Sequence, residues 1–232
     1  MSRFKLKDTL NTRDLGGYYL EGGELTISNV FVRSDAPLNL SEEDVKSLIE
    51  NNIRTIIDLR SDEETKRKPY ALMNNKDFKY YHRQIFGGGT IPKSGEFVPI
   101  SYFEMVDEKK SIFNVMKILA NVEGGALYHC AVGKDRTGVI SALLLLIVGT
   151  KREDVLSDYE ASWDNLKDEL IEYCKSNERV NLDIVTPKRE YMEKFLDMFH
   201  EKYNSIEEYL LQIGLNNDEI TKLRGKLVKG IK

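Results

Sequence analysis

The chain has few of the residues that build disulfide frameworks or metal sites. Its 232 residues include two cysteines, three histidines and one tryptophan. Cys130 and Cys174 are too few for a disulfide-stabilised fold, and the histidines lack the paired spacing of a zinc site. We therefore expect no metal and no cofactor. A free thiol fits a reducing compartment such as the cytoplasm.

Membrane and secretion signals are missing as well. Residues 1–7 lack the apolar stretch of a secretory signal peptide. The longest apolar run, residues 139–148, covers about half of a membrane span and is better explained as a buried helix. These features predict a cytoplasmic protein without an integral membrane segment.

Charge of one sign does not dominate the chain. Lys and Arg total 34 against 38 Asp and Glu, which gives a net charge of −4. This balance argues against nucleic acid as an obligatory partner. The length and an ordinary content of 41% hydrophobic and 31% charged residues predict one substantial domain over residues 1–232. The oligomeric state stays open.

Chemistry is concentrated in residues 129–138, which read HCAVGKDRTG. They follow a short apolar stretch at 125–128 and precede the apolar run at 139–148, which predicts a buried strand, a loop and a buried helix. In such a unit the loop N–H groups and the helix N-terminus face one small volume that suits a phosphate dianion. The same positive field favours thiolate over thiol, so Cys130 is the candidate nucleophile.

The other residues of the loop have candidate roles in the same chemistry. Arg136 has the fork geometry to grip two phosphate oxygens. Thr137 is placed to give a hydrogen bond to the sulfur of Cys130, and His129 is expected to orient the loop. Lys134 is either a solvated loop lysine or a contact for a substrate with more than one phosphate. The expected substrate-binding backbone groups are those of Ala131, Val132, Gly133 and Lys134.

The loop sequence resembles the signature of the protein tyrosine phosphatase superfamily. Its GKDRTG ending is similar to a bacterial branch with dual or triple specificity, which includes phosphoinositides. Further segments match that branch in order, at 11–17 (NTRDLGG), 31–34, 58–61, 158–159 and 205–215. The resemblance implies a cysteine phosphatase fold and metal-independent catalysis. It also implies that Arg13 and Asp14 contact the substrate or the loop.

The general acid is the open assignment, because the chain has no W-P-D sequence. The resemblance favours Asp135, inside the loop, and Asp58 is the second candidate. Asp58 ends a predicted strand and could instead anchor Arg136, the loop arginine. Since ligands bind at the carboxyl ends of parallel strands, Asp58 and Arg60 should lie beside the phosphate loop.

The pattern along the chain predicts an α/β fold with a mostly parallel central sheet flanked by helices. Strands are expected at 53–58, 79–85 and 127–130, helices at 39–50 and 101–122 with a break near Asp107, and a loop at 87–99. After residue 150 the chain should be wholly helical, with helix starts at Thr150, Thr186-Pro187, Ser205 and Asn216. The family resemblance implies a helical lid within 163–185.

These observations predict a metal-independent phosphatase that hydrolyses phosphotyrosine, and further phosphoserine, phosphothreonine or phosphoinositide monoesters, through a cysteinyl-phosphate. The partner is a phosphorylated protein or a phosphoinositide. One alternative makes a phosphoinositide or inositol phosphate the main substrate. A non-catalytic phosphate-binding module is less favoured because it would typically lose Cys130. An arsenate reductase is less favoured because it needs resolving thiols, and only the remote Cys174 is available.

Overall fold

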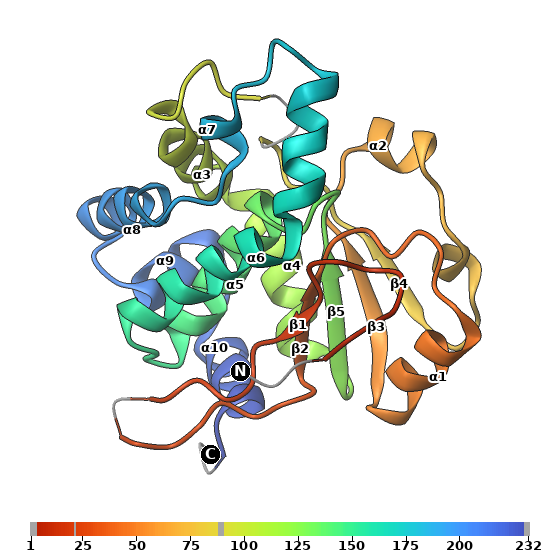
Figure 1. Cartoon of the computed structure of the whole chain (residues 1–232). Helices are drawn as coiled ribbons and strands as arrows, with labels where there is room; N and C mark the ends of the chain where they lie inside the picture. The colour runs from red at the N-terminus through yellow and green to blue at the C-terminus, as the bar shows by residue number, and fades with distance from the viewer. Residues whose placement is uncertain (1–3, 21, 88–90, 230–232) are drawn as a thin grey trace.

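A five-stranded sheet forms the centre of the computed structural model, which describes residues 4–20, 22–87 and 91–229. The strand order is β1-β2-β5-β3-β4, and only β1 runs antiparallel to its neighbour. The predicted α/β architecture with a mostly parallel sheet is confirmed (Figure 1). The strands are β1 (Arg13–Asp14), β2 (Phe31–Ser34), β3 (Ile53–Asp58), β4 (Lys79–His82) and β5 (Gly125–His129).

The central strands are buried on both faces, as their apolar sequences require. Successive residues of a strand point to opposite faces, so β3 sends Ile57 into one core and Ile56 into the other. β5 does the same with Tyr128 and Leu127. The strand predicted at 53–58 is confirmed. β5 begins at Gly125, as the apolar stretch at 125–128 predicts, and two residues before the start of the strand expected at 127–130.

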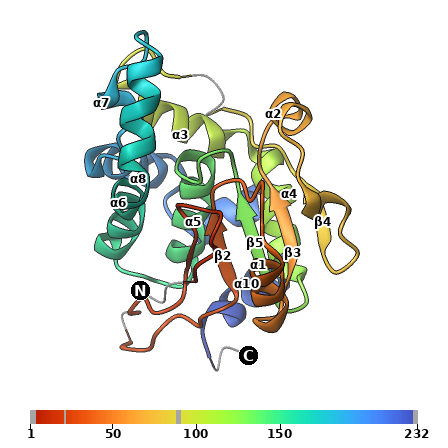
Figure 2. The ribbon, with the colours of Figure 1, turned by 45° about the vertical axis from the view of Figure 1, so that its right-hand side comes forward.

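Helices cover both faces of the sheet (Figures 1 and 2). One face packs against α1 (Glu42–Glu50) and the 3-10 turn η1 (Ala71–Asn74), and α2 (Asp62–Arg67) follows β3. A larger helical layer covers the other face. It consists of α3 (Phe97–Asp107), α4 (Lys109–Asn121), α5 (Asp135–Ile147), α6 (Arg152–Ser176), α7 (Leu182–Val185), α8 (Arg189–Tyr203), α9 (Ile206–Ile213) and α10 (Asn217–Leu227).

Several helix boundaries follow from capping groups that the sequence already shows. Ser41 caps α1 in a capping box with Asp44, as predicted. The expected break near Asp107 is confirmed, because the side chain of Glu108 accepts from the backbone of Ser111 and begins α4 there. Asn216 likewise starts α10. The apolar run at 139–148 lies in α5, which is almost entirely buried between the sheet and the helical layer.

Other boundaries differ from the prediction. The loop expected at 87–99 ends early, because α3 begins at Phe97, and Pro99 is tolerated in its first turn, where backbone N–H groups lack intrahelical partners. Residues 88–90 of that loop lie outside the described residues. The strand expected at 79–85 stops at His82.

Two predicted helix starts are wrong for a common reason. The backbone N–H of Thr150 donates to Leu145, so Thr150 closes α5, and α6 starts after Lys151 without a side-chain cap. Thr186 similarly closes α7, because its N–H and its hydroxyl both donate to the carbonyl of Leu182. Each threonine ends the preceding helix rather than beginning the next one.

Candidate active site

Residues 130–136 form a loop between the carboxyl end of β5 and the first turn of α5, as predicted. Its carbonyl groups are held outward. The carbonyl of Ala131 accepts from the backbone of Ala36, and those of Val132 and Gly133 accept from the side-chain amide of Asn11 at 3.3 and 3.0 Å. Gly133 also accepts from Nη2 of Arg33 at 2.8 Å.

Outward carbonyls determine where the amides point. In a trans peptide the C=O and the following N–H point in opposite directions, so the N–H groups of Val132, Gly133 and Lys134 face the inside of the loop. Gly133 is needed at the bend, because its φ is +72° and a Cβ there would lie 2.5 Å from the backbone nitrogen of Asp35. The loop is a concave surface of backbone donors at a helix N-terminus, which suits an anion.

Cys130 lies at the base of this concave surface. Its side chain is 2% exposed, and the N–H of Gly133 donates to the sulfur at 3.3 Å. Thr137 does not make the expected bond to sulfur, since its buried hydroxyl has no hydrogen-bond partner within the part of the chain that the structure describes.

His129 orients the loop through the carbonyl of its first residue, Cys130. Its Nδ1 lies 3.0 Å from the carbonyl oxygen of Cys130, and its Nε2 lies 2.6 Å from the hydroxyl of Tyr70. Burial lowers the pKa of His129, against an opposing effect of Asp58, so the ring is neutral. Nδ1–H then donates to the carbonyl, and Nε2 accepts from Tyr70. His129 has no free proton to transfer in this arrangement.

Arg136 projects from the first turn of α5 and is held by Glu64. Its two terminal nitrogens donate to the two carboxylate oxygens at 2.6 and 2.8 Å, while its buried Nε has no partner among the described residues. Burial alone would raise the pKa of Glu64, but the hydrogen bonds from Arg136 and from the backbone of Ser61 lower it to about 2. The sequence interpretation missed Glu64, although Ser61 and Glu64 form a capping box directly after β3 that signals the position.

Asp58 and Arg60 pair with each other rather than with the loop. Nε and Nη2 of Arg60 donate to the carboxylate of Asp58, and its Nη1 donates to the carbonyl of Lys68. Both residues are buried, and the hydroxyl of Tyr80 also donates to Asp58. Asp58 lies near His129, with 3.9 Å between Oδ1 and Nε2. The expected anchor for Arg136 is therefore Glu64 and not Asp58.

A buried set of charged and polar groups supports the loop from the side opposite its concave surface. We call Asn11, Arg13, Arg33 and Asp158 the rear clamp. Both arginines form ion pairs with Asp158 of α6, and Nη1 of Arg13 donates to Oδ1 of Asn11 at 2.6 Å. Burial alone would raise the pKa of Asp158, but the two arginines lower it. The rear clamp joins the N-terminal segment, β2 and α6 to the loop carbonyls.

The structure connects Arg13 to the loop indirectly, through Asn11 and through Asp158 and Arg33, and it does not bring Asp14 there. The carboxylate of Asp14 accepts from the backbone N–H groups of Gly16 and Asn29, so it shapes the turn before β2. Asp14 is fully buried. The residue that contacts the loop in the NTRDLGG segment is Asn11, which the sequence interpretation quoted without giving it a role.

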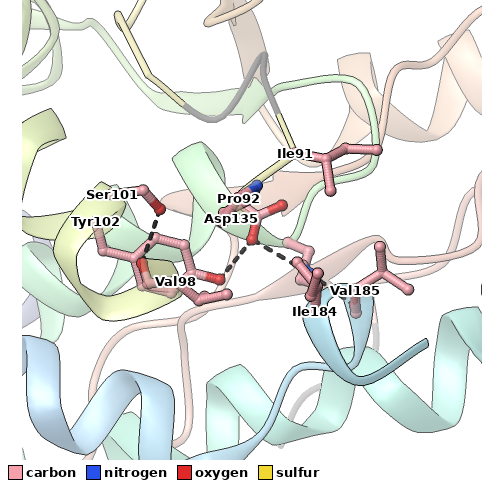
Figure 3. Close-up of a pocket in the computed structure, with 9 residues that line it drawn as sticks. Ile91, Pro92, Val98, Ser101, Tyr102, Asp135, Ile184 and Val185 are labelled. Atoms are coloured by element: carbon pink, nitrogen blue, oxygen red, sulfur yellow. Dashed lines mark hydrogen bonds and ion pairs between the residues drawn. The ribbon is translucent and has the colours of Figure 1, made fainter. Parts of the chain in front are cut away.

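The front of the loop carries Lys134 and Asp135. We call the bonds from Lys134 to Val185 and from Tyr102 to Asp135 the front contacts. Nζ of Lys134 donates to the carbonyl of Val185 in α7 at 2.7 Å and lies 3.3 Å from Oδ1 of Asp135, to which the hydroxyl of Tyr102 also donates. Figure 3 shows Asp135 among these groups, beside a cavity of about 70 Å³. The cavity is lined by Ile91, Pro92, Val98, Ser101, Tyr102, Lys134, Asp135, Ile184 and Val185.

Neither a metal site nor a membrane span is found in the described part of the chain. No group of three His, Cys, Asp or Glu side chains there could hold a metal ion. No described helix is both long and apolar enough to cross a bilayer.

Comparison with known proteins gives a consistent set of relatives. A family profile described as "Tyrosine phosphatase family" matches residues 4–229. A tyrosine-protein phosphatase of Nostoc commune is 26% identical, with 86% of this chain and 74% of that protein covered. A putative tyrosine-protein phosphatase of Cupriavidus necator is also 26% identical, over 96% of this chain and 88% of that protein. The triple specificity protein phosphatase PtpB of Mycobacterium tuberculosis is 27% identical over 52% of this chain and 49% of its own length.

Proposed function

The chain belongs to the tyrosine phosphatase family and is a phosphatase, and we propose that it hydrolyses phosphotyrosine through a cysteinyl-phosphate intermediate without a metal ion. The observation that carries this proposal is the position of Cys130 at the base of a loop whose Val132, Gly133 and Lys134 amides face one volume. The N–H of Gly133 already donates to its sulfur. Arg136 stands at the same helix start with Nε free of protein partners in the described chain.

The reaction proceeds in two balanced steps. Sγ of Cys130 attacks phosphorus as the bond to the leaving oxygen breaks, and Asp135 gives that oxygen a proton. Water then attacks the cysteinyl-phosphate and returns a proton to Asp135, which releases phosphate and the thiolate. The loop amides and Arg136 carry the charge of the transferring phosphoryl oxygens in both steps.

Asp135 suits the role of general acid better than Asp58 does. The side chain of Asp135 is 28% exposed at the front of the loop, whereas that of Asp58 is fully buried. Asp58 also accepts hydrogen bonds from Arg60 and from Tyr80. A carboxyl held by a guanidinium and closed off from solvent is a poor proton donor to a substrate.

The experiment that tests the mechanism measures phosphate release by the wild-type chain and by Cys130→Ser. We expect the variant to lose turnover by at least about a thousandfold, because the hydroxyl is a far weaker nucleophile than a thiolate. Phosphate binding, measured calorimetrically, should stay within about threefold, because the loop amides are unchanged. Turnover of Cys130→Ser near the wild-type rate would rule out the covalent mechanism.

The substrate range is the second part of the proposal. One relative, matched over 52% of this chain, is named a triple specificity protein phosphatase, which supports a substrate range wider than phosphotyrosine. The further classes, phosphoserine, phosphothreonine and phosphoinositides, come from the resemblance of the loop sequence at 129–138. Lys134 is the loop cation that could contact a second phosphate, after it leaves the carbonyl of Val185. Phosphate release from phosphotyrosine peptides, phosphoserine peptides and phosphoinositides, with Cys130→Ser in parallel, separates these classes. A preference for phosphoinositides would favour the alternative in which a phosphoinositide or inositol phosphate is the main substrate.

We further propose that residues 1–232 act as one phosphatase domain in the cytoplasm and that 163–185 form its lid. Ser162 of α6 bonds to Asn11 and Arg13, so the first half of α6 is fixed to the rear clamp. Beyond Ser162 the helix is mostly exposed, and Lys134 links the loop to the end of α7.

Limited proteolysis of 163–185 with and without a phosphate analogue tests the lid, and equal cleavage in the two conditions would contradict it. Both cysteines are free, which fits a reducing compartment.

A further inference from the structure

Asp135 has two carboxylate oxygens in different environments. Oδ1 faces two donors, the hydroxyl of Tyr102 and, 3.3 Å away, the ammonium of Lys134. Oδ2 has no hydrogen-bond partner among the described residues. Because donors already occupy Oδ1, a proton bound by this carboxyl sits on Oδ2.

The donor on Oδ1 is itself held by a second tyrosine. The hydroxyls of Tyr102 and Tyr159 lie 2.7 Å apart, and each has one proton to give. Since Tyr102 donates to Asp135, Tyr159 must donate to Tyr102. The hydrogen bonds therefore run in one direction, from Tyr159 in α6 through Tyr102 in α3 to Asp135 at the start of α5.

Both tyrosines keep their protons and their positions. Burial raises the pKa of Tyr102 and of Tyr159, and the nearby Asp135 raises both further. The rings are almost completely buried, and Tyr102 makes edge contacts with Tyr159 and with Phe195. A donor fixed by packing on three helices can set the orientation of an otherwise mobile carboxyl.

We propose that Tyr102, supported by Tyr159, is a positioning residue that fixes the proton of Asp135 on Oδ2 and presents it to the leaving group. This inference rests on the proposed function, because it takes Asp135 as the acid of the first step. When the proton has left Oδ2, the hydroxyl of Tyr102 and the ammonium of Lys134 stabilise the charge on the carboxylate. The same arrangement then holds Oδ2 ready to accept a proton from water.

The test compares leaving groups. An acid matters most for a poor leaving group such as the tyrosine phenol, whose pKa is about 10, and little for an activated aryl phosphate with an acidic phenol. We expect Tyr102→Phe to lower kcat/KM, which reports the step in which the leaving group departs, by about tenfold for a phosphotyrosine peptide, the factor for one hydrogen bond of ordinary strength. For the activated aryl phosphate the loss should be under about twofold. Tyr159→Phe should show the same pattern with a smaller loss.

The matched control removes a similar bond elsewhere on α3. The buried Tyr203 of α8 donates to the carboxylate of Asp107, the last residue of α3, and neither residue belongs to the front contacts. Tyr203→Phe should leave kcat/KM unchanged for both substrates. Asp135→Asn serves as the reference and should discriminate between the two substrates more strongly than Tyr102→Phe.

Each result decides one proposal. Equal losses on both substrates in Tyr102→Phe, while Asp135→Asn discriminates, would overturn the positioning role and leave the proposed function intact. Equal losses on both substrates in Asp135→Asn would also overturn the positioning role of Tyr102. An inactive wild-type chain, or an active Cys130→Ser, would instead contradict the proposed function itself. If Tyr102→Phe does not fold, Tyr159→Phe carries the same test, with equal losses again overturning the proposal.

Discussion

The phosphate loop is held in opposite ways at its two sides. At the rear clamp, fully or nearly fully buried arginines, an aspartate and an asparagine bind each other and the loop carbonyls. At the front contacts, Asp135 is partly exposed and Lys134 reaches only the end of the short helix α7. The rear therefore fixes the shape of the loop, while the front is the side at which we propose that the loop rearranges around different substrates.

Breaking the rear clamp should have the largest effect on stability. Asp158→Asn would leave the guanidinium groups of Arg13 and Arg33 buried without their counter-charge. We expect the free energy of unfolding, measured in urea, to fall by about 3–5 kcal/mol. Asp197→Asn is the control, because its pair with Arg152 is 65% and 47% exposed and should contribute under about 1 kcal/mol. Similar losses in the two variants would remove the distinction between buried and peripheral pairs.

Glu64, which binds Arg136 and belongs to neither the rear clamp nor the front contacts, makes the stability of the site dependent on pH. Its pKa of about 2 is below the ordinary value of 4.5. A carboxylate with a lowered pKa stabilises the fold above pH 4.5, and that contribution is lost as the pH falls toward 2. Glu64→Gln should lower the free energy of unfolding at pH 7 by about 1–3 kcal/mol and flatten its pH dependence in this window.

The same variant should also lower kcat by about tenfold, since Arg136 loses the partner that orients it. Acid titrations of unfolding and phosphate-release assays together give both readouts. Glu63→Gln, at an exposed position in the same turn of α2, is the control and should change neither. An unchanged acid profile in Glu64→Gln would show that the bidentate pair with Arg136 does not persist in solution.

Breaking the front contacts should have the smallest effect on stability. Lys134→Met removes the bond to Val185, and we expect the free energy of unfolding to change by under about 1 kcal/mol. Cleavage by chymotrypsin after the exposed Tyr173 and Leu182 should speed up about fivefold, because α7 opens more often. Lys175→Met, which removes an exposed pair with Glu172 only, should leave cleavage unchanged. Unchanged cleavage in Lys134→Met would mean that this bond does not hold α7.

The centre of the site could be predicted because its parts are contiguous in the sequence. Cys130, the loop amides and Arg136 are placed by one strand, one loop and one helix start, and local pattern suffices for that. The sheet followed in the same way from the apolar strand at 53–58 and the run before His129. The roles of Glu64 and Asp158 did not follow. Glu64 lies 72 residues from Arg136, which it binds, and Asp158 lies 125 residues from Arg33, through which it reaches the loop carbonyl of Gly133. Only the folded sheet brings such carboxylates to the loop.

Side-chain roles failed where one residue could serve two elements. Thr150 and Thr186 are residues that commonly begin helices, but in the structure they donate hydrogen bonds to the preceding helices and end them. Asp58 carries the carboxylate that could anchor the loop arginine, but Arg60, two residues further on, donates to that carboxylate instead. In each case a hydrogen bond with a group close in the sequence gives the residue a role other than the expected one.

Backbone amides form the concave surface of the loop, so its hydrogen-bond donors do not depend on which side chains the loop residues carry. Val132 contributes its amide to the interior, while Val132 and its neighbour Ala131 are both exposed to solvent. Substitutions at these two positions therefore alter what the protein meets at the mouth of the site without altering the backbone hydrogen bonds that we propose for phosphate. This leaves two adjacent positions at which selection, or a protein engineer, can diversify substrate choice while the catalytic step stays the same.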